Sequence, residues 1–320
     1  MVIRKIGRIG VLMGGPSEER QISLRSGKAV YESLKNANFD VVPIDIESQD
    51  LEENIRKIKS YNIEVAFIAL HGRFGEDGTI QKLLEDLGIP YTGSGVLASK
   101  FALDKVLSRQ RFLSFGLNVP DYIVIEKKDF DKTYLSLNKF KFPLVVKPAC
   151  QGSSIGLSIV EDKDSLSKAI DLAFSFDERI IIEEYIKGRE LTVGILDEEP
   201  LPVIEIIPKK KFFDYEAKYT PGLTEYVVPA KLEEKIASQA KNSALLAHKS
   251  LDCFGFSRVD MILNKENKVF VLEVNTIPGL TETSLLPKAA KAVGIGFLEL
   301  CLKLIDSAYR RAKISVYNRE

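Results

Sequence analysis

The sequence contains few of the residues that build disulfide frameworks and zinc sites. Its 320 residues include three cysteines, at positions 150, 253 and 301, and only two histidines. An odd number of widely spaced cysteines is typical of a protein from a reducing compartment, and it does not make a disulfide framework. We therefore expect a cytoplasmic protein with free thiols. Because there is no Cys-x-x-Cys pair, a structural zinc site is not expected either.

An excess of one charge and long apolar runs are also missing. The 45 basic side chains equal the 45 acidic ones, so there is no electrostatic case for binding nucleic acid or an anionic membrane. No apolar run reaches membrane-spanning length. The first 13 residues are too charged for a signal peptide and are better explained as a first strand. The length is sufficient for two or three domains, each with its own core.

The first part of the chain alternates apolar strands with helical patterns. Such alternation predicts a parallel sheet covered by helices, and we assign it to an N-terminal α/β domain over residues 1–97. Ser17 is expected to be the N-cap of the first helix. Glu19 in the first turn and His71 after a buried strand would face the crevice above the sheet, where such sheets bind ligands. Either residue could instead serve a local role, with Glu19 complementing the helix dipole and His71 capping its loop.

The rest of the chain predicts two smaller domains, over residues 98–187 and 188–320. A single helix is expected from Ala98 to Phe115, which would place Lys105 in mid-helix and exposed to solvent. Lys147 ends a strand and precedes a loop rich in glycine and serine, and another strand follows. A Walker loop has its lysine after the glycines and leads into a helix, so this is not one. The loop could be a flap whose N–H groups cover phosphates, or an ordinary hairpin.

The most informative segment is a predicted hairpin over residues 257–275. Strand alternation would place Val269, Val271, Glu273 and Asn275 on one face. Asp260 stands in the apolar partner strand. Carboxylates in such sequence are costly to bury unless a cation neutralises them, and Mg²⁺ is usually bound by one or two carboxylates with substrate phosphates. We therefore expect a site for a pair of Mg²⁺ ions at a nucleotide triphosphate. The alternative is a hairpin whose acids face water.

Ordered motifs along nearly the whole chain resemble those of the D-alanine–D-alanine ligases in the ATP-grasp superfamily. The matching stretches, in chain order, are Gly14-Gly-Pro-Ser-Glu-Glu-Arg, Ala69-Leu-His-Gly-Arg-Phe-Gly-Glu-Asp-Gly, Tyr91-Thr-Gly-Ser-Gly, Val146-Lys-Pro-Ala-Cys-Gln-Gly-Ser-Ser-Ile-Gly, Asp214-Tyr-Glu-Ala-Lys-Tyr, Arg258-Val-Asp and Leu272-Glu-Val-Asn-Thr-Ile-Pro-Gly-Leu-Thr. The resemblance implies an α/β N-terminal domain followed by two ATP-grasp domains of α+β type, with ATP bound between their antiparallel sheets.

The resemblance also implies roles for individual residues. Those expected at ATP are Lys105, Lys147, Ser153, Ser154, Glu183, Glu190 and Lys218. Those expected to bind Mg²⁺, with Mn²⁺ as an alternative metal, are Asp260, Glu273 and Asn275. Those expected at the two D-alanines are Glu19, His71, Ser153, Tyr219, Arg258, Gly279, Ser284 and Leu285. In this set Glu19, Ser153, Tyr219, Arg258 and Gly279 would form the catalytic group, with Arg258 and the Gly279 N–H stabilising an oxyanion.

The implied activity is ATP-dependent joining of two D-alanines for peptidoglycan precursors, and the implied assembly is a homodimer. The sequence departs from the family pattern at Glu184 and Tyr185, where some members have Lys-Trp, which affects the expected adenine pocket. Residues 212–226 are polar, aromatic and turn-rich, and we expect them to form a long loop that serves as a lid. Relatives that make D-alanyl-D-lactate usually lack a Lys-Tyr pair in this lid, so Lys218-Tyr219 favours D-alanine as second substrate. A regulatory protein without chemistry, or a dehydrogenase, is disfavoured because the phosphate and metal positions have competent residues and no dinucleotide fingerprint is present.

Overall fold

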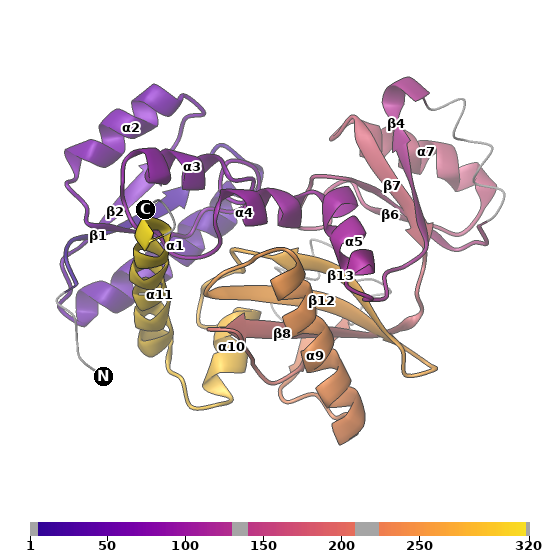
Figure 1. The fold of residues 1–320 in the computed structure, drawn as a ribbon. Coiled ribbons are helices and arrows are strands. Elements are labelled where there is room, and N and C mark those ends of the chain that lie inside the picture. The colour runs from indigo at the N-terminus through magenta and orange to yellow at the C-terminus, as the bar shows by residue number, and fades with distance from the viewer. Residues whose placement is uncertain (1–5, 130–139, 209–223, 318–320) are drawn as a thin grey trace.

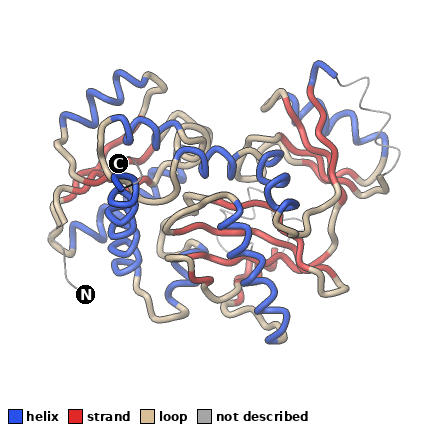
Figure 2. Tube along the Cα trace, viewed as in Figure 1, coloured by secondary structure: helices blue, strands red, loops and turns tan. Residues whose placement is uncertain are grey.

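The computed structural model describes residues 6–129, 140–208 and 224–317. Within these ranges the chain forms three sheets, each with its own helices (Figures 1 and 2). The predicted lid residues Lys218 and Tyr219 lie outside the described ranges. No helix within the described ranges is long and apolar enough to cross a membrane.

The N-terminal sheet is parallel, as the alternating pattern predicts. Its strands are β1 (Ile9–Gly14), β2 (Val41–Ile46) and β3 (Val65–Ile68), in the order β2-β1-β3. β1 and β3 are fully buried, because helices cover the sheet and leave no solvent-facing side for these strands. The helices of this region are α1 (Arg20–Asn36), α2 (Leu51–Ser60) and α3 (Thr79–Asp86).

The start of α1 differs from the prediction. Glu19, not Ser17, occupies the N-cap position, and it makes no side-chain capping bond. The Ser17 hydroxyl instead donates a 2.7 Å hydrogen bond to the carbonyl of His71, and the Glu19 N–H donates to Ser17 Oγ. Ser17 therefore ties the loop before α1 to the loop after β3, and the carboxylate of Glu19 stands at the mouth of the crevice.

The predicted single helix over 98–115 is wrong, since the segment forms two helices. α4 (Val96–Leu103) ends at Asp104, and α5 (Lys105–Ser114) begins directly after it. The Asp104 carboxylate accepts the N–H groups of Val106 and Leu107 at 2.9 and 3.1 Å, which makes it an N-cap. Lys105 therefore lies at the start of a helix, and its side chain is buried. The expectation that it faces solvent is also wrong.

The central sheet is antiparallel, with strand order β4-β7-β5-β6. These strands are β4 (Tyr122–Glu126), β5 (Leu144–Pro148), β6 (Ser158–Val160) and β7 (Arg179–Glu184). A short 3₁₀ helix η1 (Lys127–Asp129) follows β4, and α7 (Lys163–Phe174) packs on the sheet. The pairing of β5 with β6 confirms the predicted strand, loop and strand after Pro143.

The C-terminal sheet has the order β11-β10-β8-β12-β13, and the short strand β9 pairs with the last residues of β8. Its strands are β8 (Gly188–Leu196), β9 (Glu199–Pro200), β10 (Ile204–Pro208), β11 (Thr224–Val227), β12 (Phe256–Asn264) and β13 (Val269–Asn275). The helices are α9 (Glu234–Ser250), α10 (Leu285–Lys291) and α11 (Phe297–Tyr317). α9 packs its alanines on one face of this sheet. α11 lies beside α1 and shares a core with β1 and β3 (Figure 1).

The predicted hairpin of β12 and β13 is confirmed, but its regular alternation is not. Asp260 pairs with Glu273 and Met261 pairs with Val271, so Leu272 is an extra residue without a partner. Such a bulge interrupts the alternation of side chains. Every side chain after Leu272 therefore points to the face opposite the one that regular alternation would give it. Val269 and Val271 consequently pack in the core under α9, whereas Glu273 and Asn275 lie on the other face of the sheet. The prediction that these four residues share one face is wrong.

Candidate active site

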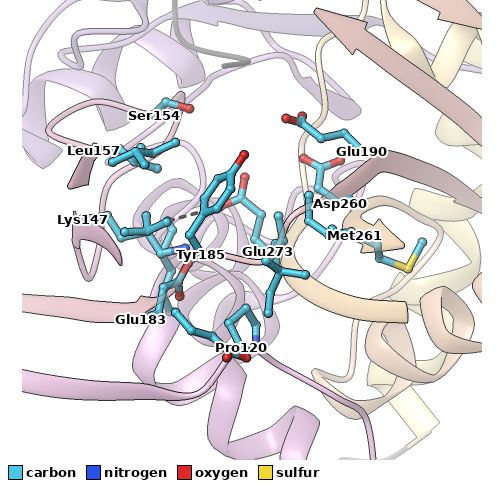
Figure 3. A pocket seen from close by; sticks show the side chains of 18 of the residues that line it. Pro120, Lys147, Ser154, Leu157, Glu183, Tyr185, Glu190, Asp260, Met261 and Glu273 are labelled. Atoms are coloured by element: carbon cyan, nitrogen blue, oxygen red, sulfur yellow. Dashed lines mark hydrogen bonds and ion pairs between the residues drawn. The ribbon is translucent and has the colours of Figure 1, made fainter. Parts of the chain in front are cut away.

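A cavity of about 360 Å³ lies between the central and C-terminal sheets (Figure 3). The central sheet contributes Lys147 and Glu183, and the C-terminal sheet contributes Glu190, Asp260 and Glu273. Apolar side chains form much of the remaining wall, among them Val145, Ile159, Leu191, Met261, Ile262 and Leu272. A cavity with both apolar walls and charged groups suits a ligand that joins a flat ring to an anionic group.

Lys147 and Glu183 meet on neighbouring strands of the central sheet. Lys147 Nζ donates a 2.7 Å hydrogen bond to Glu183 Oε1, drawn as a dashed line in Figure 3. The other oxygen, Oε2, is ion-paired with Arg109 on α5. Burial lowers the pKa of Lys147 to about 8, with Arg109 and Lys105 acting in the same direction and Glu183 opposing them. Burial alone would raise the pKa of Glu183, but Arg109 and Lys147 outweigh it and lower that pKa.

Lys105 connects the flap to the C-terminal sheet. Its Nζ donates a 2.5 Å hydrogen bond to the carbonyl of Gln151 and lies 3.4 Å from Glu273 Oε2. Its backbone N–H also bonds the carbonyl of Ala149. The break at Asp104 therefore directs this lysine into the cavity, where a continuous helix would not.

Asp260 is the centre of a second cluster, on the face of the sheet that the bulge exposes. Arg258 contacts both of its oxygens, with Nε–Oδ1 and Nη2–Oδ2 distances of 2.9 and 2.6 Å. Thr192 Oγ1 donates to Oδ1 at 2.7 Å, and Asn275 Nδ2 donates to Oδ2 at 3.1 Å. Glu273 is the strand partner of Asp260. The predicted metal residues are thus brought together.

The donor set of this cluster fits magnesium. Two carboxylates and one amide oxygen are hard ligands, and Mg²⁺ takes few protein ligands when phosphate oxygens complete its octahedron. Over the ranges that the structure describes, no group of three or more His, Cys, Asp or Glu side chains could hold a metal by itself. Asp260 would have to exchange its bonds with Arg258 and Asn275 for the metal.

The flap between β5 and β6 approaches the loop before α1. Ser153 Oγ donates a hydrogen bond to Glu19 Oε1. A Cβ on Gly152 would stand 2.9 Å from the other oxygen of Glu19, so a side chain here would crowd the contact. Ser153 and Ser154 have φ angles of 49° and 59°, which is the left-handed region. This region is uncommon for serine and is found where surrounding contacts enforce it.

A second cavity, of about 330 Å³, adjoins the first and shares Glu273 with it. Its walls include Glu19, His71, Ser153, Arg258, Gly279, Ser284 and Leu285. The described residues predicted at the two D-alanines therefore line one cavity, although their elements come from the N-terminal and C-terminal regions and from the flap. Ser284 Oγ accepts the N–H of Thr281 at 3.1 Å and precedes α10.

His71 is buried in this cavity wall. Its Nε2 lies 3.1 Å from Ser26 Oγ, and its carbonyl accepts the hydroxyl of Ser17. Burial lowers the pKa of His71 to about 4, and the charge of Arg258 acts in the same direction. The imidazole is therefore neutral at pH 7 and offers hydrogen bonds without a charge.

Two residues of the site were missed by the sequence analysis. Glu76 lines the second cavity and accepts the Gly72 N–H at 2.7 Å. Burial and the neighbouring charge of Glu19 together raise the pKa of Glu76 to about 8. The Gly-Glu-Asp-Gly stretch after His71 could have indicated it. Arg109 is the second, and nothing in its helical surroundings distinguishes it from a surface arginine.

Two antiparallel sheets that enclose lysines and carboxylates, next to a parallel-sheet region, define the ATP-grasp class of enzymes. The family model described as "D-ala D-ala ligase C-terminus" matches residues 112–306, and the one described as "D-ala D-ala ligase N-terminus" matches residues 8–52 and 47–94. The chain belongs to the D-alanine–D-alanine ligase family.

Individual relatives agree with this assignment. The D-alanine–D-alanine ligase of Syntrophotalea carbinolica is 47% identical over 304 residues, covering 95% of this chain and 97% of the relative. That of Geotalea uraniireducens is 45% identical over 304 residues, covering 95% and 96%. The crystal structure of the Bacillus anthracis D-alanine–D-alanine ligase complexed with ATP is similar with a TM-score of 0.86 and 40% identity, over 98% of this chain and 100% of that one. The VanG D-Ala:D-Ser ligase of Enterococcus faecalis has a TM-score of 0.82 and 30% identity, over 95% and 100%.

Proposed function

We propose that this chain is an ATP-dependent ligase that joins two D-alanines into D-alanyl-D-alanine, with release of ADP and phosphate, for peptidoglycan precursors. The observation that carries the proposal is the junction of the two cavities at Glu273. One cavity offers cations and an apolar slot, which suit a nucleotide. The other offers carboxylates and Arg258, which suit an amino acid that is both ammonium and carboxylate. A phosphate group at the junction would reach an amino acid carboxylate.

The nucleotide would lie between the central and C-terminal sheets. Lys105 and Lys147 would bind its phosphates, and the N–H groups around Ser153 and Ser154 would cover them. Glu183 and Glu190 would bind the adenine and the ribose. Lys218, which lies outside the described ranges, is the further lysine proposed at the phosphates. The burial of Lys147 supports this role, because a lysine in a dry cavity attracts an anion more strongly than one in water.

Asp260, Glu273 and Asn275 would hold the magnesium ions, with manganese as an alternative. When bound, the ions would neutralise phosphate charge during transfer. Arg258 contacts both oxygens of Asp260 in this structure. A metal at Asp260 would compete with that contact and leave the guanidinium available to substrate.

The first D-alanine would bind with its ammonium at Glu19, beside His71. Its carboxylate attacks the γ-phosphorus of ATP, which breaks the bond to the β-phosphate oxygen and gives an acyl phosphate and ADP. Phosphoryl transfer requires mainly positioning and charge neutralisation. The hydrogen bond between Ser153 and Glu19 supports this arrangement, because it joins the phosphate flap to the ammonium site. Tyr219 is proposed as a further partner from the lid.

The second D-alanine would place its carboxylate near Ser284 and Leu285. Its amine, after losing a proton, attacks the acyl carbon and forms a tetrahedral oxyanion. Arg258 and the N–H of Gly279 would stabilise that charge, and phosphate then leaves with its electron pair. A Cβ on Gly279 would come within 3.1 Å of Ser284 Oγ, which supports a close approach of the backbone to this part of the site. D-Lactate as second substrate is the alternative, and no feature of the cavity favours it.

We also propose the domain division 1–97, 98–187 and 188–320, a homodimer and a cytoplasmic location. Each of these ranges contains one of the three sheets, which supports the division. Cys150, Cys253 and Cys301 are free thiols, as expected in a reducing compartment. Light scattering on the purified chain tests the dimer.

The activity is tested by phosphate release from ATP with Mg²⁺, comparing D-alanine, L-alanine, and D-alanine with D-lactate, with products identified by mass. Release and a dipeptide with D-alanine alone are expected. A depsipeptide at neutral pH would favour the lactate alternative. ATP binding without release under any of these conditions would contradict a ligase.

A further inference from the structure

Arg109 is a buried cation that the proposed mechanism does not use. It lies on α5, one helical turn after Lys105, and its side chain is fully buried. Its guanidinium is ion-paired with Glu183 Oε2 and lies over the ring of Tyr122, with 5.1 Å between Cζ and the ring centroid. Nη2 makes the contact with Glu183, whereas Nε and Nη1 have no hydrogen-bond partner among the residues that the structure describes. Burying a guanidinium costs free energy unless interactions with other charges compensate for the lost hydration.

The charges around Arg109 do not balance. We define the cationic cluster as Lys105, Arg109, Lys147, Glu183 and Glu273, in which Glu183 pairs with Arg109 and Lys147, and Glu273 pairs with Lys105. Three cations and two carboxylates leave it with one positive charge in excess. Asp260 stands outside this count because Arg258 pairs with it. Glu190 also lines the cavity, from the C-terminal sheet, and it is not part of the cluster as defined.

Whether Lys147 can offer its charge to a ligand depends on which cation pairs with Glu183. Lys147 lines the nucleotide cavity, whereas Arg109 does not. If Lys147 were the sole partner of Glu183, the two would neutralise each other, and an incoming phosphate would have to break their 2.7 Å bond without compensation. With Arg109 on the second oxygen, the carboxylate keeps a cation when Lys147 turns to the phosphate.

We propose that Arg109 is a positioning residue that holds the Glu183 carboxylate and thereby frees the charge of Lys147 for the nucleotide phosphates. The inference rests on the proposed function, because it assigns an ATP-binding role to Lys147. Arginine suits the task better than lysine, since it stays charged when buried and stacks on an aromatic ring as it does here on Tyr122.

The test compares the KM for ATP in the wild type, Arg109→Met and Arg109→Lys. The Met variant is expected to raise the KM for ATP about tenfold, because Lys147 remains tied to Glu183. The KM for D-alanine should stay within about twofold, since the second cavity is untouched. Arg109→Lys keeps the charge and should restore most of the ATP affinity. Equal losses in the Lys and Met variants would contradict a charge effect.

A pH profile separates positioning from a merely structural role. Arg109 lowers the pKa of Lys147. In Arg109→Met the alkaline decline of kcat/KM for ATP should therefore move to higher pH by roughly one unit. The other charged groups that act on Lys147 are Glu183 and Lys105, and they are the same in both proteins. An unchanged pH profile and an unchanged KM, with only a lower melting temperature, would overturn the proposal.

Two further variants complete the design. In a Glu183→Gln background, Arg109→Met should add less than about twofold to the KM for ATP, because no carboxylate competes for Lys147. Additive effects would contradict the proposal. Arg111→Met, on the same helix and paired at the surface with Asp252, is the matched control and should behave as wild type.

A folding defect, a failure of the proposed function and a failure of the Arg109 inference give different results. If Arg109→Met does not fold, Arg109→Gln takes its place with the same expectations, because it is polar but uncharged. If the wild type does not consume ATP with D-alanine, the proposed function fails. A normal wild type with an unaffected Arg109 variant defeats only the present inference.

Discussion

The two cavities of the site hold charge in opposite ways. The nucleotide cavity has a cationic cluster in which three cations meet two carboxylates. The second cavity has two acids, Glu19 and Glu76, near Arg258 and a neutral His71. Under the proposed function, the first would bind an anion and the second an ammonium group. The pKa of Glu76, about 8, means that one of the two acids is protonated at neutral pH, so they do not repel each other at full charge.

Removing Arg258 should have the largest effect, because it lines the second cavity and also pairs with Asp260, which lines the first. Arg258→Ala is expected to lower kcat by about 10²–10³, since one oxyanion donor is lost. Phosphate release under saturating ATP and D-alanine measures it. Arg189→Ala, which breaks a salt bridge to Glu205 in the same sheet, is the control. Wild-type turnover in Arg258→Ala would refute the oxyanion assignment.

Removing Lys147 tests the nucleotide cavity alone. Lys147→Met should raise the KM for ATP about 100-fold, because a buried charge-assisted contact to phosphate is lost. The KM for D-alanine should change far less. ATP titrations at fixed D-alanine make the comparison, with the exposed Lys168→Met as control. A larger effect on D-alanine than on ATP would reverse the roles of the two cavities.

Neutralising Glu19 tests the second cavity alone. Glu19→Gln should raise the KM for D-alanine about tenfold and leave that for ATP within about twofold, since only the amino acid presents an ammonium there. Steady-state kinetics with each substrate varied in turn gives both values. Glu18→Gln, the neighbouring exposed acid, is the control. Equal effects on both substrates would mean that the two sides are not separate.

The smallest effect is expected on stability, at Glu76. The folded chain raises the pKa of this acid from 4.5 to about 8. Between these values the folded state keeps a proton that the unfolded state loses, so the free energy of unfolding falls as pH rises through this window. Glu76→Gln removes this pH-dependent loss of stability. The free energy of unfolding of the variant, relative to the wild type, should therefore increase by at least about 1 kcal/mol from pH 5 to pH 9. Melting curves at both pH values measure it, with Glu32→Gln as control. An equal difference at both pH values would contradict the raised pKa.

The site was predictable where its residues carry their signal locally. Lys147 stands directly before a glycine and serine loop, and Asp260, Glu273 and Asn275 stand in a hairpin that otherwise reads as core. The motif resemblance extends this to Glu19, Arg258 and Ser284, which the structure brings into one cavity. Arg109 gave no such signal, because an arginine in a helix is usually at the surface.

Other features depend on neighbours distant in sequence. The break at Asp104 is stabilised by its ion pair with Arg179 from the central sheet, at 2.5 Å. No glycine or proline marks it. The bulge at Leu272 follows from the pairing of β13 with β12, which aligns Asp260 with Glu273. Ser17 leaves the N-cap position because the carbonyl of His71 lies within reach of its hydroxyl.

The sequence by itself determined most of the strands, the parallel N-terminal sheet, the hairpin and the kinds of residue at the phosphate and metal sites, because periodicity, turns and motifs are local properties of the chain. Tertiary structure decided which faces those residues occupy and which charges meet. Lys105 enters the cavity only because two helices meet at Asp104. Arg109 shares Glu183 with Lys147 only because α5 packs against the central sheet. Such pairings depend on distances between segments that no local pattern encodes.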